Sequence, residues 1–130
     1  MSHFRRGAPI LLLFLLLVGL VAADASPDQE AGVRIALTPA GVQVTPSSIT
    51  VEPGEAVQWS SDMPFAVAVE RNAELFGQEL PPAALRGRAN APARATVGAD
   101  AEAGSYKYAV AVWDGENVWV VDPEIIVRRP

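Results

Sequence analysis

The chain has 130 residues, with no cysteine, one histidine, and 15 acidic against 10 basic side chains, which gives a net charge of −5. Without cysteine it forms no disulfide bonds. Its longest basic cluster is Arg128-Arg129, so nucleic acid is not an expected partner, because neutralising phosphates needs several clustered cations.

Residues 1–25 have the pattern of a secretory signal peptide. Arg5 and Arg6 precede an uninterrupted apolar run over 10–23, and Ala23-Asp24-Ala25 is a small-x-small cleavage pattern, with Val21-Ala22-Ala23 as the alternative. The run is shorter than the roughly 20 apolar residues that a bilayer-spanning helix needs, which favours a cleaved signal over a retained anchor. The product is then periplasmic or secreted, keeps no membrane span, and has lost its one histidine.

The polar residues 26–32 are predicted to be a flexible lead-in, followed by one β domain over 33–130. Apolar residues then alternate with period two, which is typical of half-buried strands. The turn Glu52-Pro53-Gly54-Glu55 predicts a hairpin or a tight corner between two of these strands. The first group of predicted strands covers 33–37, 42–44, 49–51, 56–59 and 65–69.

The alternation stops over 70–90, which contains Pro81-Pro82 and two glycines and is predicted to be a long crossover with one helical turn around 73–76. Further strands are predicted over 93–97, 105–113, 118–121 and 124–128, with Asp114-Gly115 as a hairpin turn. About eight short strands without an amphipathic helix predict an all-β fold, either an antiparallel β-sandwich or a Greek-key barrel.

Three stretches, 49–59, 62–67 and 103–108, resemble the cupredoxin pattern in their order and spacing. The resemblance implies a cupredoxin-like fold. In copper-binding members the metal is held by two histidines and one cysteine, often with an axial methionine. The matching positions here are Phe65, Val110 and Trp113, and no methionine follows Met63. The resemblance therefore implies a metal-free member with degenerate ligand positions and no cofactor.

Two polar groups are candidates for other chemistry. Asp114, Glu116, Asp122 and Glu124 supply oxygen ligands for calcium, although Asp114-Gly115 is equally explained as a solvated turn. Ser60-Ser61-Asp62, with Lys107 as a base, is the nearest approach to a catalytic set, but the same triplet is typical of a loop with side-chain-to-backbone hydrogen bonds. We do not expect an enzyme.

A possible binding surface comprises Trp113, Trp119, Arg86 and Arg88. The two tryptophans flank the predicted turn, so their indoles are expected either to form one exposed platform for a sugar ring or partner chain, or to be buried. Trp59 is expected in the core. Arg86 and Arg88 lie in the long crossover, where they suit an anionic ligand or acidic partner, or are ordinary surface residues.

These observations lead to three functional hypotheses. The first is an exported, non-catalytic, cupredoxin-like domain without a copper site that acts as a binding or interaction module in the cell envelope. The second is an envelope accessory factor or carboxylate enzyme that binds carbohydrate through Trp113 and Trp119. The third is a structural subunit or homo-oligomer. Under the first hypothesis, the expected partner is a protein or a small molecule.

Overall fold

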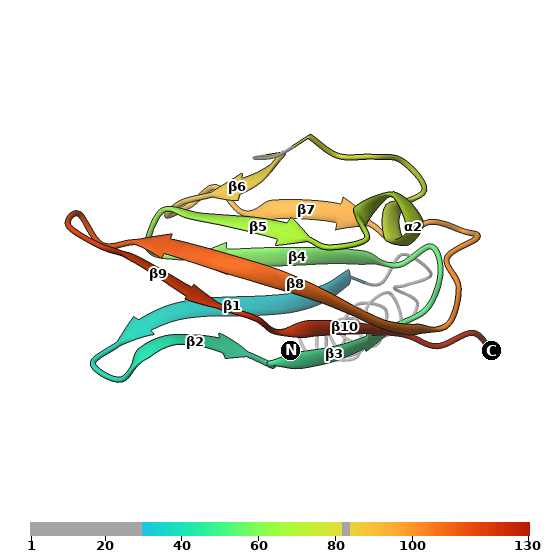
Figure 1. Ribbon diagram of the computed structural model, residues 1–130, viewed down its shortest axis with the longest axis horizontal. Coiled ribbons are helices and arrows are strands. Elements are labelled where there is room, and N and C mark those ends of the chain that lie inside the picture. The colour runs from blue at the N-terminus through green and yellow to red at the C-terminus, as the bar shows by residue number, and fades with distance from the viewer. Residues whose placement is uncertain (1–29, 82–83) are drawn as a thin grey trace, which may run out of the picture.

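The computed structural model describes residues 30–81 and 84–130, which form two β-sheets and one short helix (Figure 1). The alternating apolar residues fold into strands because each strand buries one face between the two sheets. The strands of the described residues are β1 (Glu30–Thr38), β2 (Gly41–Thr45), β3 (Ser48–Val51), β4 (Ala56–Ser61), β5 (Phe65–Val69), β6 (Leu85–Gly87), β7 (Ala93–Thr96), β8 (Gly104–Trp113), β9 (Val118–Val121) and β10 (Glu124–Val127).

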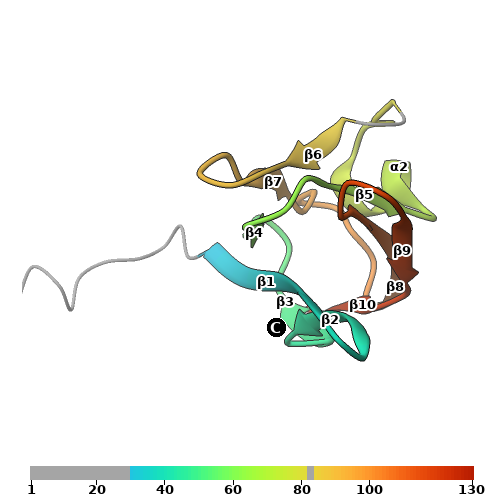
Figure 2. The same cartoon turned by 90° about the vertical axis from the view of Figure 1, so that its left-hand side faces the viewer.

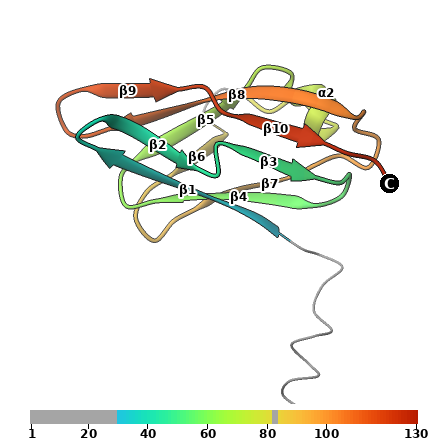
Figure 3. The same cartoon turned by 90° about the horizontal axis from the view of Figure 1, so that it is seen from below.

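The two sheets enclose one interior, as the view along the strands shows (Figure 2). The first has the strand order β2-β1-β4-β7, and the second has the order β3-β10-β8-β5-β6, with β9 also paired to β8. The β1–β2 and β8–β9 hairpins extend from the same end of the molecule (Figure 3). This architecture confirms the predicted all-β sandwich.

The expectation of a purely antiparallel arrangement is wrong in two places. Strand β1 pairs in parallel with β4, and β3 pairs in parallel with β10. Both parallel pairs arise because the chain changes sheets after β2 and again after β3. The turn over 52–55 is accordingly a corner between sheets rather than a hairpin, with Glu55 N–H donating to the carbonyl of Glu52 at 3.1 Å.

Several element boundaries differ from the prediction. Strand β1 begins at Glu30, three residues before the expected start of the domain, because Glu30 to Gly32 pair with the start of β4. The predicted signal over 1–25 and the lead-in residues 26–29 lie outside the described residues. The expected helical turn is α2 (Asn72–Phe76), whereas β6 was not predicted within the crossover. No helix in the described ranges is long and apolar enough to cross a membrane.

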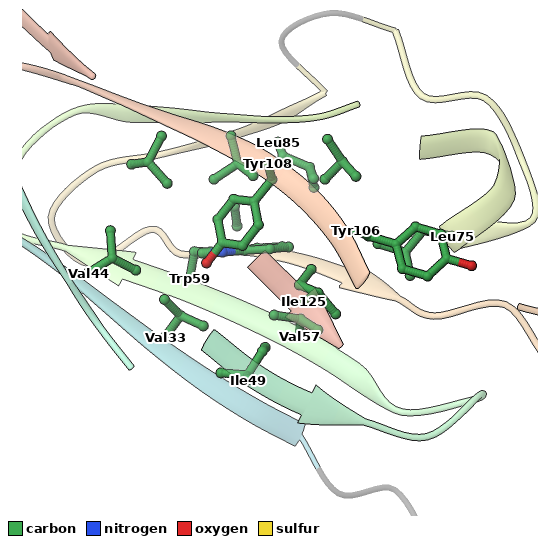
Figure 4. Close-up of a cluster of buried hydrophobic side chains, with 14 of the residues drawn as sticks. Val33, Val44, Ile49, Val57, Trp59, Leu75, Leu85, Tyr106, Tyr108 and Ile125 are labelled. Carbon is green, nitrogen blue, oxygen red and sulfur yellow. The ribbon is translucent and has the colours of Figure 1, made fainter. Parts of the chain in front are cut away.

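Aromatic residues from both sheets meet at the centre of the core (Figure 4). Trp59 on β4 is fully buried, as predicted, and its indole packs against the ring of Tyr108 on β8. The ring centroids are 5.7 Å apart and the planes are inclined by 71°, an edge-to-face contact. This contact joins the two sheets directly.

Candidate functional site

Two of the three positions that match copper ligands point into the core. Phe65, at the start of β5, is 5 % exposed, and Val110, on β8, is fully buried. Phe65 pairs with Val112 and Val110 pairs with Val67, so both lie on the inner face of the same sheet. They form part of the hydrophobic core.

The third matching position, Trp113, lies on the opposite face of that sheet. It ends β8, pairs with Val118, and is 52 % exposed. Successive residues of a strand point to opposite faces, so Trp113 points outward where Val110 and Val112 point inward. The three positions therefore do not converge on one pocket.

The expected platform of two indoles is not formed. Trp119 pairs with Val112, whereas Trp113 pairs with Val118, and neighbouring rows of an antiparallel ladder face opposite sides. The prediction of one shared aromatic surface is therefore wrong. The Trp119 indole N–H instead donates to a carboxylate oxygen of Asp114 at 2.9 Å, and this contact ties the side chain to its own hairpin.

Asp114 caps the hairpin turn with both of its carboxylate oxygens. One carboxylate oxygen accepts from the backbone N–H of Asn117 at 2.7 Å and of Glu116 at 2.8 Å, while the other accepts from Trp119. These hydrogen bonds, led by that from Asn117, hold the pKa of Asp114 below its usual value. The solvated-turn interpretation of Asp114 is confirmed.

Of the other carboxylates proposed for calcium, Glu116 lies in the same turn as Asp114, whereas Asp122 and Glu124 lie away from it. Glu124 begins β10, is paired in register with Lys107, and accepts a hydrogen bond from the Ser105 hydroxyl at 3.2 Å. Asp122 lies two residues earlier, just after the end of β9 that is far from the turn. Across residues 30–81 and 84–130, no three or more acidic, histidine or cysteine side chains form a group able to hold a metal ion.

The triplet Ser60-Ser61-Asp62 was expected to be a loop, but Ser60 and Ser61 end strand β4 and Asp62 follows it; the expected side-chain-to-backbone hydrogen bond is formed by Ser61. The Ser61 hydroxyl is buried and accepts from the backbone N–H of Met63 at 3.1 Å, and Asp62 forms an ion pair with Arg34 at 2.9 Å. Lys107 lies in the other sheet, on β8. The structure therefore gives these side chains structural contacts of their own.

The outer face of the sheet formed by β5, β8 and β9 is apolar. Ala66, Ala111 and Val120 form one row across the three strands. Trp113 and Val118 form the next row on the same face, two residues further along β8. We call these five residues the apolar face. Val118 and Val120 are 65 % and 63 % exposed, so this face is open in the described part of the chain.

The other sheet provides an internal comparison. Its outward positions on β1, β2, β4 and β7 are mostly polar, as is usual for a sheet with one face packed on the core and the other in water. The polar outward residues include Arg34, Gln43, Thr45, Gln58, Ser60, Arg94 and Thr96, and Ala36 and Ala56 are the apolar exceptions. The apolar face is therefore not a general property of this sandwich.

An open groove of about 670 Å³ runs beside the apolar face, and we call it the Trp113 groove. Trp113 and Val118 line one part of it, and Arg86 and Arg88, which the sequence marked as a possible binding surface, line another. Its remaining lining residues are Pro64, Phe65, Ala66, Gly87, Ala91, Ala111 and Val112. The structure thus brings three of the four predicted surface residues together and leaves Trp119 out.

Ala66 and Ala111 were not among the site residues predicted from the sequence. Ala66 alternates with Phe65 and Val67 along β5, and Ala111 alternates with Val110 and Val112 along β8. Small apolar residues in the outward phase of two paired strands were the available signal. That signal becomes informative only when the pairing of Ala66 with Ala111 is known.

Comparisons with known proteins support the fold. No family model and no curated protein matches the chain. Among solved structures, the oxidised form of plastocyanin from Dryopteris crassirhizoma matches with a TM-score of 0.52 and 17% identity, covering 75% of this chain and 100% of that chain. A purple cupredoxin from Nitrosopumilus maritimus matches with a TM-score of 0.49 and 18% identity, covering 75% of this chain and 99% of that chain.

A variant of amicyanin also matches, with a TM-score of 0.49 and 18% identity over 82% of this chain and 89% of that chain. Of these three structures, plastocyanin has the TM-score above 0.5, and the fold assignment rests on it. The chain has a Greek-key, cupredoxin-like β-sandwich fold, as its sequence predicts. At this level of identity the likeness concerns the fold alone.

Proposed function

We propose that this chain is an exported, non-catalytic, cupredoxin-like domain without a copper site, which acts as a binding or interaction module in the cell envelope. The apolar face carries the proposal. Large exposed side chains on one sheet, beside a polar outer face on the other, mark a surface that a partner covers. Isolated exposed hydrophobic residues would need no such explanation.

The chemistry of the matching positions supports the absence of a copper site. Phe65 and Val110 have no lone-pair donor atoms, and the indole nitrogen of Trp113 is a hydrogen-bond donor only. Two of these side chains are core residues and the third points to the other face of the sheet. The residues present therefore do not fit a blue-copper ion.

Titration of the purified protein with Cu(II) and Cu(I) tests this half of the proposal. We expect no intense visible absorption band and no stoichiometric uptake. A one-to-one complex with a strong visible band would overturn it.

Site-specific photo-crosslinking in the exporting cell tests the binding role. A benzophenone amino acid is placed at Val120 on the apolar face, and at Gln43 on the polar sheet as the matched control; both positions are exposed. We expect defined adducts from position 120 and none from 43. No adduct at 120, or equal adducts at both positions, would refute the role, and recovery of the chain in the cytoplasmic fraction would refute export.

The carbohydrate-binding alternative depended on two indoles in one surface. Because Trp113 and Trp119 lie on opposite faces of the hairpin, that arrangement is lost. The non-catalytic role is therefore the proposal that the geometry favours.

A further inference from the structure

We propose that the Trp113 groove binds a small carboxylate that carries a flat apolar group. The inference rests on the proposed binding function and names the chemical class of one ligand for that surface. Three features of the groove support it: its shape, the placement of two arginines, and the limited area of the apolar face around it.

The shape of the groove follows from the sizes of the paired side chains. Ala66 and Ala111 are direct neighbours across β5 and β8, so two methyl groups form a low floor. Trp113 and Val118 stand beside this floor as a paired row of larger side chains. The volume, about 670 Å³, lies within the roughly 300–1,000 Å³ of small-molecule sites, which are mostly apolar with a few polar groups.

The polar groups of the groove are two arginines. Arg86 pairs in register with Ala66, and Arg88 follows two residues later. In the described part of the chain, Arg34, Arg71 and Arg94 form ion pairs with carboxylates, while Arg86 and Arg88 form none. No acidic residue lines the groove. Two available guanidinium groups on a chain with a net charge of −5 favour an anion at this point.

The backbone that carries the arginines is held in place. Arg88 and Ala91 exchange two backbone hydrogen bonds, of 3.0 Å and 2.9 Å. Gly87 packs so closely on the Phe65 ring that a Cβ atom would not fit there. A fixed backbone keeps the attachment points of Arg86 and Arg88 beside the groove, so binding does not have to order this segment of the chain.

The limited area favours a small ligand over a second copy of the chain. The large exposed side chains of the apolar face supply on the order of 300 Å² of surface, whereas a stable interface buries roughly 800 Å² per partner. An aromatic ring on the alanine floor would lie beside Trp113 and Val118 and cover part of this surface. Its carboxylate would then meet Arg86 and Arg88.

The test is an NMR titration of the purified, exported protein with three probes. 3-Phenylpropionate combines the ring and the carboxylate, 3-phenylpropanamide is its neutral counterpart, and acetate lacks the ring. We expect saturable shifts at the Trp113 indole N–H and the amides of Ala66 and Ala111. We also expect 3-phenylpropionate to bind about tenfold more tightly than the amide, because charge-assisted hydrogen bonds are the stronger ones.

Variants separate the two halves of the ligand. The double variant Arg86→Gln/Arg88→Gln should reduce the affinity for 3-phenylpropionate to that for the amide, whereas Trp113→Ala should weaken both. Arg128→Gln, at an exposed arginine outside the groove, is the matched control and should change neither.

Three outcomes would overturn the inference: no saturable shift, equal affinity for the acid and the amide, or shifts at the same residues that depend on protein concentration alone. The last would identify a second copy as the occupant. If 3-phenylpropionate does not bind but position 120 still gives defined crosslinks, this inference is refuted and the proposed function stands.

Discussion

Replacing Tyr108 with phenylalanine tests whether the centre of the core holds polar atoms without hydrogen bonds. Tyr108 is 1 % exposed and Trp59 is fully buried. The Trp59 indole N–H faces the Tyr108 hydroxyl closely enough to lower its pKa against the effect of burial, but neither atom forms a hydrogen bond of good geometry among the described residues. An unsatisfied buried group costs about 1–3 kcal/mol, and the void left by one oxygen costs on the order of 1 kcal/mol. Tyr108→Phe should therefore be as stable as the parent, or up to about 2 kcal/mol more stable.

Tyr106→Phe is the matched control, two residues away on the same strand. Its hydroxyl donates to the carbonyl of Glu102 at 2.7 Å, and the residue is 2 % exposed. Losing this bond should cost about 0.5–1.5 kcal/mol. The Arg71 guanidinium, 4.3 Å from the ring centroid, keeps its contact in the variant. The two variants should therefore change the free energy of unfolding in different ways.

Urea unfolding followed by circular dichroism measures both differences, and each kcal/mol should also shift the melting temperature by roughly 4–8 °C in a domain of this size. Equal destabilisation by the two substitutions would refute the reasoning. It would mean that the Tyr108 hydroxyl has a hydrogen-bond partner, such as a buried water molecule.

Three further predictions follow from local contacts. Burial raises the pKa of Tyr108 above its ordinary 10.0, so the hydroxyl loses its proton at a lower pH in the unfolded chain than in the folded one. The free energy of unfolding should therefore fall as the pH rises above about 10, and it should fall less in Tyr108→Phe. Urea unfolding measured at several pH values would show this difference. Gly87→Ala should lower the free energy of unfolding by about 1–3 kcal/mol, because the new Cβ would overlap the Phe65 ring and lie 2.7 Å from the Ala91 carbonyl oxygen. Gly32 has open space around it, so Gly32→Ala should leave the free energy of unfolding nearly unchanged in the same urea assay. The lowered pKa of Asp114 means that its carboxylate stabilises the turn above pH 3.8, and that this stabilisation is lost as the pH falls through the lower folded-state pKa. The indole N–H resonance of Trp119, which donates to Asp114, should shift over the same pH range. A resonance that does not change with pH would contradict this hydrogen bond.

The sequence predicted most strands because alternation is a local signal. Strand β9 begins and ends at the expected residues, and β8 differs from its prediction by one residue. Strand β6 was missed because it has three residues, with one apolar position, inside a segment rich in proline and glycine. Its pairing with β5, rather than its own pattern, makes it a strand.

The candidate site was less predictable because it depends on register. Whether Trp113 and Trp119 share a face is decided by which residues pair across the hairpin, and a shift of one residue reverses the answer. The parallel pairing of β1 with β4 likewise joins segments that no local pattern relates. The prediction of Trp59 as a core residue succeeded because a large aromatic in the inward phase of a strand has few alternatives.

The position of β10 in its sheet has a consequence for the order of folding. Among the described strands, β3 pairs with β10 alone, although more than half of the chain separates them in sequence. During synthesis, residues 48–51 therefore have no neighbouring strand until residues 124–127 are available. Closing such a distant contact is slow compared with forming the β8–β9 hairpin. Strand β3 would therefore join its sheet late in folding. Removing residues 124–127 from the chain would remove the strand that joins β3 to the rest of the sheet.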